Sequence, residues 1–116
     1  MHYISYLYFQ NNNIDGIIPP SIGNFTYLVD LDLSYNNFSG AIPETMEYLT
    51  VLEHLDISNN QLHGTIPDKI GFLTSLLSLD LSINKLTGTI PEEIVSLTNL
   101  QYLHLQHNQL TGTIPQ

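Results

Sequence analysis

Three stretches of the sequence are nearly alike: LDLSYNNFSGAIP at residues 31–43, LDISNNQLHGTIP at 55–67 and LDLSINKLTGTIP at 79–91. Each begins 24 residues after the one before it, and weaker copies of the pattern extend to both ends of the 116-residue chain without a gap. A fixed period of this length is typical of repeat proteins, in which each repeat buries its apolar face against its neighbours. The sequence therefore predicts a single solenoid over residues 1–116.

Each register of the repeat keeps one kind of residue. Apolar residues hold the strand-like registers, and asparagine, glycine and proline each occupy one register in all five copies. The constant positions are Asn12, Asn36, Asn60, Asn84 and Asn108; Gly16, Gly40, Gly64, Gly88 and Gly112; and Pro19, Pro43, Pro67, Pro91 and Pro115. The predicted repeats are 4–27, 28–51, 52–75, 76–99 and an incomplete 100–116.

These registers have a physical reading. The alternation in LxL predicts a short strand, and stacked copies pair in parallel about 4.8 Å apart. The asparagine after the strand should point inward, where its amide can satisfy backbone groups of its own and the next coil. Glycine suits a backbone conformation that a Cβ would crowd, and Ile-Pro predicts the start of a tight helical turn because proline has a fixed φ.

Charge and composition exclude several classes of function. Eleven acidic residues face two lysines, which gives a net charge of −9 and no basic footprint for a nucleic acid. The natural electrostatic complement is a basic protein or peptide. The absence of cysteine excludes thiol catalysis and thiolate metal sites. No apolar run is long enough to span a bilayer, so we expect no direct membrane insertion by this segment.

The candidate binding surface consists of the variable positions that face outward between the strand leucines. Tyrosine and histidine gather toward its two ends, acidic residues lie in the middle, and exposed aromatics are common interface anchors. The predicted partner-binding residues are Tyr6, Tyr8, Asp30, Asp32, Tyr35, His54, Asp56, Asp80, Ile83, Tyr102 and His104. The serine column Ser34, Ser58 and Ser82 is expected to face outward as well.

Asp32, Asp56 and Asp80 form one column of this surface. Like charges on neighbouring strands, roughly 5 Å apart, raise one another's pKa values and attract cations. The alternative is an ordinary solvated surface, because LDLS and LDIS are the usual strand sequences of the repeat. A metal site is not expected, since carboxylates on flat strands do not converge on one ion. No cofactor is expected either.

Catalysis is not expected. His54, His104 and His107 have no recognisable nucleophile nearby, and an open arc offers no cleft, so a pH-sensitive interface suits them better. Two N-glycosylation sequons begin at Asn24 and Asn37 and agree with a secretory context.

The complete pattern LxxLxLxxNxLxGxIPxxIxxLxx resembles the plant-specific class of leucine-rich repeat. That class forms the ectodomains of plant receptor-like kinases and receptor-like proteins, and the polygalacturonase-inhibiting proteins. The resemblance implies an α/β solenoid in the form of a right-handed superhelix, with a parallel β-sheet on the concave face and short 3-10 or helical turns on the convex side. It also implies a second short strand around the Leu-x-Gly segments.

The same resemblance implies a non-catalytic, extracellular or cell-surface module that binds a protein or peptide in signalling or defence, as a segment of a receptor ectodomain. One alternative is a secreted inhibitor of a microbial cell-wall hydrolase. An alternative of another class is ice binding, because the solenoid aligns Thr65, Thr89 and Thr113, and also Thr87 and Thr111, although the columns fail at other repeats.

Cysteine-paired caps usually enclose the repeats in this family, and this sequence has none. Uncapped ends expose core residues. We therefore expect either a fragment of a longer protein or a small solenoid that associates end to end.

Overall fold

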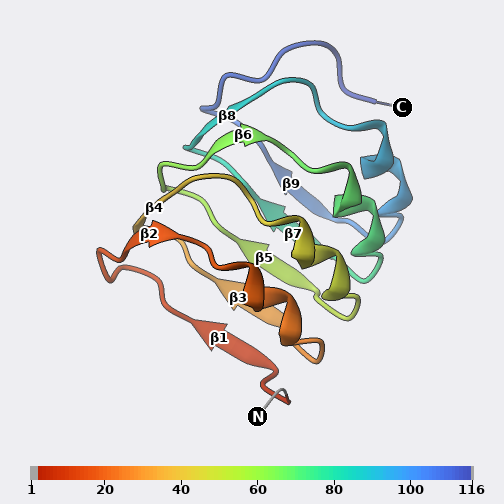
Figure 1. The fold of residues 1–116 in the computed structure, drawn as a ribbon. Coiled ribbons are helices and arrows are strands. Elements are labelled where there is room, and N and C mark those ends of the chain that lie inside the picture. Colours follow the sequence, from red (N-terminus) through yellow and green to blue (C-terminus); the bar gives the residue numbers. More distant parts are fainter. Residues whose placement is uncertain (1–2, 116) are drawn as a thin grey trace.

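The computed structural model describes residues 3–115, which wind into a stack of coils (Figure 1). A five-stranded parallel sheet forms the concave face, in the order β1-β3-β5-β7-β9. Its strands are β1 (Tyr6–Tyr8), β3 (Asp30–Asp32), β5 (His54–Asp56), β7 (Ser78–Asp80) and β9 (Tyr102–His104). Each strand residue pairs with the residue 24 positions later, as Leu31 does with Leu55. The predicted strands and their register are confirmed.

Two small sheets lie around the Leu-x-Gly segments, as the resemblance implied. The first pairs β2 (Asp15–Ile17) with β4 (Asn37–Ser39), and the second pairs β6 (His63–Thr65) with β8 (Lys85–Thr87). Their register differs from that of the concave sheet, because Gly16 lies opposite Phe38, 22 positions later. Residues in one sequence column are therefore diagonal rather than adjacent here.

The asparagine ladder lies where the register changes. Asn36 Oδ1 accepts hydrogen bonds from the backbone N–H of Asn12 and of Ile14, which lie 24 and 22 positions earlier. Asn60 Nδ2 donates to the backbone oxygens of Leu33, Ile57 and Ser58, and its Oδ1 accepts from Phe38 N–H. The amide thus serves its own coil and the preceding one. The prediction that it reaches the next coil was wrong in direction, because the turn tilts the side chain back toward the N-terminus.

Within residues 3–115, four short 3-10 helices form the opposite side of the stack (Figure 1). They are η1 (Pro20–Asn24), η2 (Glu44–Tyr48), η3 (Asp68–Phe72) and η4 (Glu92–Ser96). Each begins directly after the repeat's proline, which has extended backbone with φ from −70° to −65°. The predicted Ile-Pro turn start is therefore confirmed, with the proline as the residue that precedes the helix rather than its first residue.

The core lies between these two sides and is complete only in the inner coils. Leu55, Leu79 and Ile57 are 0–1% exposed, whereas Leu103 in the last strand is 38% exposed. Stacking on both sides removes a leucine from water, and a strand at the edge of the stack has a neighbour on one side only.

The residue before each ladder asparagine has a left-handed backbone. Tyr35 has φ +56°, Asn59 +57° and Ile83 +55°. Glycine and asparagine adopt this region readily, but a β-branched residue there is a strained exception. The unusual backbone predicted for the repeat's glycine is confirmed at Gly40, which has φ +76°, whereas the left-handed residues before the asparagines were not predicted.

Candidate functional site

The concave sheet carries an acidic depression of about 370 Å³. Eight of the eleven predicted partner-binding residues line it, and we call these eight the acidic floor: Tyr8, Asp30, Asp32, His54, Asp56, Asp80, Tyr102 and His104. Ser78 also lines it and was not among the predicted site residues, although it occupies the same column as His54. The floor contains neither lysine of the chain, so no ammonium group lies among its carboxylates.

Tyrosines border the floor at its N-terminal edge. Tyr8 donates its hydroxyl to Asp30 Oδ2 at 2.6 Å, and this hydrogen bond raises the pKa of Tyr8 to about 12. Tyr6 stacks on Tyr8 with ring centroids 6.4 Å apart. Both rings are more than half exposed, so they present aromatic surface beside a carboxylate.

The aspartates of the central column are partly engaged within the chain. In each of β3, β5 and β7 the final aspartate Oδ1 accepts both the backbone N–H and the hydroxyl of the serine two residues on, with a hydroxyl distance of 2.6 Å. The pairs are Asp32 with Ser34, Asp56 with Ser58 and Asp80 with Ser82. One carboxylate oxygen per residue is thereby committed to shaping the turn.

These turns correct the expectation for the serine column. Ser34, Ser58 and Ser82 are only 3–4% exposed, so they do not belong to the outward surface. The strong hydrogen bond to the aspartate draws each hydroxyl inward at the point where the strand ends. The aspartate and serine of the LDLS and LDIS sequences therefore stabilise the turn, and the aspartate also lines the floor.

Asp56 lies at the centre of the column and is half-buried. Burial raises its pKa, the bonds from Ser58 oppose this, and the charges of Asp80 and Asp32 add to the rise. The expected mutual repulsion is present for this residue, but desolvation is the larger cause. Among residues 3–115, no group of three or more His, Asp or Glu side chains is arranged to hold a metal ion.

Tyr35 and Ile83, which are also predicted partner-binding residues, do not line the acidic floor. They line a second depression of about 510 Å³ beyond the ends of the strands, together with side-chain amides. We call its outward residues the amide rim: Asn11, Asn13, Tyr35, Asn59, Gln61 and Ile83. The left-handed turn after each strand carries its residue past the edge of the sheet, and this backbone geometry is what separates the two surfaces.

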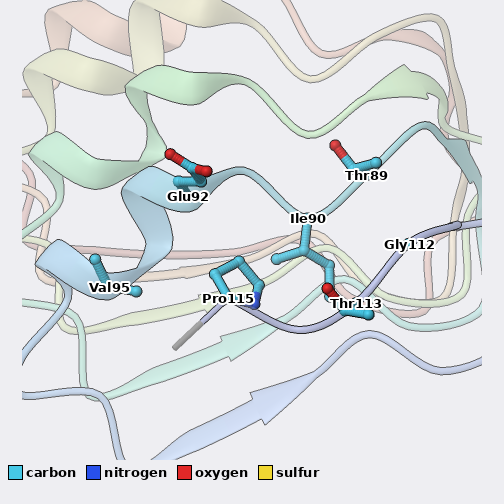
Figure 2. Close-up of a pocket in the computed structure, with 7 residues that line it drawn as sticks. All are labelled: Thr89, Ile90, Glu92, Val95, Gly112, Thr113 and Pro115. Atoms are coloured by element: carbon cyan, nitrogen blue, oxygen red, sulfur yellow. The ribbon is translucent and has the colours of Figure 1, made fainter.

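The two ends of the stack have depressions of their own. At coil one an apolar hollow of about 370 Å³ is lined by residues including Leu7, Phe9 and Phe25. Near the C-terminal end, Figure 2 shows Ile90 directed toward the segment that holds Thr113 and Pro115, and Val95 on η4 lines the same depression. End-to-end self-association through such surfaces stays a prediction.

The sequon asparagines Asn24 and Asn37 are both exposed, Asn24 at the end of η1 and Asn37 in β4. Their positions are compatible with a glycan, and their use stays a prediction. In the part of the chain that the structure describes, no helix has the length and apolar character needed to cross a membrane.

Solved plant ectodomains have the same coil geometry. The ectodomain of the Arabidopsis thaliana receptor kinase GASSHO1/SCHENGEN3, solved with CASPARIAN STRIP INTEGRITY FACTOR 2, is 36% identical with a TM-score of 0.96 over 98% of this chain. The Arabidopsis receptor kinase HAESA, solved with the peptide hormone IDA and the co-receptor SERK1, is 39% identical with a TM-score of 0.95 over 98% of this chain. This chain spans only 14% and 19% of those two structures.

A plant ice-binding protein is also similar, with 38% identity and a TM-score of 0.91 over 97% of this chain and 37% of its own length. A comparison with curated proteins yields no significant match. The family model described as leucine rich repeat matches residues 2–62 and 63–110. On this match, and on the shared coil geometry, the chain belongs to the leucine-rich-repeat family.

Proposed function

We propose that this chain is a non-catalytic module that binds a basic peptide or a basic segment of a protein through the acidic floor. The observation that carries the proposal is the floor itself, four aspartates bordered by Tyr8, Tyr102 and two histidines on the concave sheet. Carboxylates without local cations attract Lys and Arg, and exposed aromatics give contact area at low entropic cost.

The similar ectodomains support a peptide as ligand, because one was solved with the peptide hormone IDA and another is a plant peptide hormone receptor solved with RGF2. We propose further that the chain is a segment of a plant receptor-like ectodomain, which places it at the cell surface or outside the cell. The serine hydroxyls next to the floor support a role without catalysis, since Ser58 donates to Asp56 rather than to a histidine.

The test is a binding titration with peptides that differ only in charge. Dodecamer libraries with and without Lys and Arg are passed over the immobilised chain, and retained peptides are measured by calorimetry at low salt. The variant D32N/D56N/D80N keeps an oxygen for each serine but removes three charges. We expect its affinity for basic peptides to fall at least about tenfold, which corresponds to about 1.4 kcal/mol.

A matched variant, D68N/E92Q/E93Q, removes three charges from η3 and η4 on the opposite side. It changes net charge equally and should leave the affinity within about twofold. Equal losses in both variants would indicate a general charge effect and contradict a site on the floor.

Ice binding is a second candidate, favoured by one observation. Five exposed threonines lie along the side of coils three to five, with Thr65 opposite Thr87 and Thr89 opposite Thr111. These neighbours are 22 residues apart, so the pairs differ from the columns aligned by sequence. Thermal hysteresis in the purified chain, abolished by Thr87→Val and Thr111→Val together, would establish it, and its absence removes this candidate.

A further inference from the structure

The amide rim differs chemically from the rest of this acidic molecule. Of the residues that line this depression, none is charged, although the chain carries eleven acidic residues. It is a shallow, open depression of about 510 Å³, so a ligand would lie along its surface rather than inside it. A basic peptide has no reason to prefer this surface over the acidic floor, so its complement is a neutral polar ligand.

The amides of the rim fall into two groups. Asn36 and Asn60 line the depression, but their side chains already form hydrogen bonds with backbone groups of two coils. Within residues 3–115, the side-chain amides of Asn11, Asn13 and Gln61 make no hydrogen bond to the protein. Asn59 donates only a 3.3 Å bond to Ser58 Oγ. The rim therefore offers several carboxamides that can each donate and accept.

Tyr35 and Ile83 are costly residues for the positions they hold. Both have left-handed backbone, where asparagine is the favourable choice and stands at Asn59 in the coil between them. They are 57% and 44% exposed, so the core does not require them. Backbone N–H groups in this column bond to the following coil, as Tyr35 does to Ser58 O at 3.1 Å and Asn59 to Ser82 O at 3.0 Å. Tyr35 and Ile83 thus flank Asn59 at roughly 10 Å from each other, two strand spacings apart.

We infer that the amide rim binds a neutral oligosaccharide. Sugar hydroxyls both donate and accept hydrogen bonds, which matches carboxamides better than carboxylates or ammonium groups. The apolar C–H face of a pyranose ring fits against the exposed ring of Tyr35, whose π face is negative and attracts the C–H edge. Ile83 supplies an apolar border on the other side of Asn59. This site is separate from the acidic floor and does not depend on the peptide proposed there.

The test is an NMR titration of the chain produced in bacteria, so that Asn37 carries no glycan. The probes are cellohexaose, xylohexaose and mannohexaose, with hexagalacturonate as an anionic control of the same length. We expect at least one neutral probe to shift the side-chain amide signals of Asn59 and Gln61 saturably in the millimolar range. The net charge of −9 should keep hexagalacturonate from binding.

Two substitutions separate binding from folding. Tyr35→Asn removes the aromatic face and relieves the backbone, so the variant should unfold at the same or a higher temperature yet bind at least about tenfold more weakly. Tyr35→Phe retains the ring and should bind within about threefold of wild type. His107→Asn makes the equivalent backbone change in coil five, where φ is +60°, outside the rim, and should leave affinity unchanged.

Three results overturn the inference. One is the absence of any shift with all three neutral probes, and another is a shift that maps to the acidic floor instead of the rim. The third is wild-type affinity in Tyr35→Asn, which would show that the ring takes no part in binding.

Discussion

The inner coils and the end coils contain the same residues at the same registers but bury them differently. Asn60 makes four hydrogen bonds to backbone groups and is 5% exposed, whereas Asn12 in coil one makes similar bonds to Phe9 O and Gln10 O and is exposed. Leu79 is fully buried and Leu103 is not. The same repeat residue therefore contributes a different amount to the free energy of unfolding in different coils. Its burial comes from the neighbouring coils on both sides rather than from the repeat itself.

The largest expected difference between inner and end coils is in the strand leucines. Leu79→Ala leaves a cavity between two coils and should lower the free energy of unfolding by about 3–4 kcal/mol. Leu103→Ala removes a side chain that is 38% exposed and should cost about 1 kcal/mol. Urea denaturation followed by circular dichroism measures both. Equal losses would contradict the claim that the last strand is energetically peripheral.

The ladder asparagines should follow the same order with smaller values. Asn60→Ala leaves the buried Phe38 N–H without its acceptor, whereas Leu33 O still accepts from Asn36 Nδ2, so we expect a loss of about 2 kcal/mol. Asn12→Ala exposes the corresponding groups to water and should cost less than about 1 kcal/mol. Hydrogen exchange adds a local readout, because the Phe38 amide should lose protection in the first variant only.

Much of the fold could be predicted because the repeat fixes both period and chemistry. Leucines at alternating positions, a constant asparagine and an Ile-Pro pair are enough to predict strand, ladder and turn, and all three are present. The 22-residue register of the side sheets was not predictable, since it arises where Asn36 Oδ1 bonds to both Asn12 and Ile14. Aligning the repeats in the sequence assumes that paired residues are 24 positions apart in every part of the coil.

The candidate site could be predicted in part for a related reason. Alternation along β3, β5 and β7 identifies which side chains face outward, and this gave most of the acidic floor. Beyond the strand ends alternation no longer applies, so Ser58 was wrongly placed outside and the separate depression that Ile83 lines was not predicted. The left-handed residue between strand and asparagine is the signal that was missed, and Asn11 and Asn59 in that column indicate it.

The left-handed column allows a reciprocal exchange between neighbouring coils. Asn59→Ile places a β-branched residue at φ +57° and should cost about 1–2 kcal/mol of stability. Ile83→Asn relieves the same strain but loses a half-buried side chain, so stability should stay equal or rise by up to about 1 kcal/mol. Thermal melts of both variants provide the comparison. A loss above about 1 kcal/mol for Ile83→Asn would show that Ile83 is held for packing.

The smallest expected effect is electrostatic and depends on pH. Because burial raises the pKa of Asp56, the folded chain binds this proton more tightly than the unfolded chain. The stability that follows is complete below the unfolded pKa near 3.8 and is lost as the pH rises through the folded pKa. Asp56→Asn keeps an acceptor for Ser58 without the charge, so its melting temperature should exceed that of wild type by a few degrees at most near pH 7. The gain should vanish near pH 3.

The matched control for this pH dependence is Asp15→Asn, an exposed carboxylate in β2 away from the acidic floor. This variant removes the same charge from an exposed position, so its melting temperature near pH 7 should lie within about a degree of wild type. If Asp56→Asn instead melts below wild type near pH 7, the hydrogen bonds from Ser58 outweigh desolvation. The aspartate column would then stabilise each turn through its charge, and the floor would be acidic because the fold requires it.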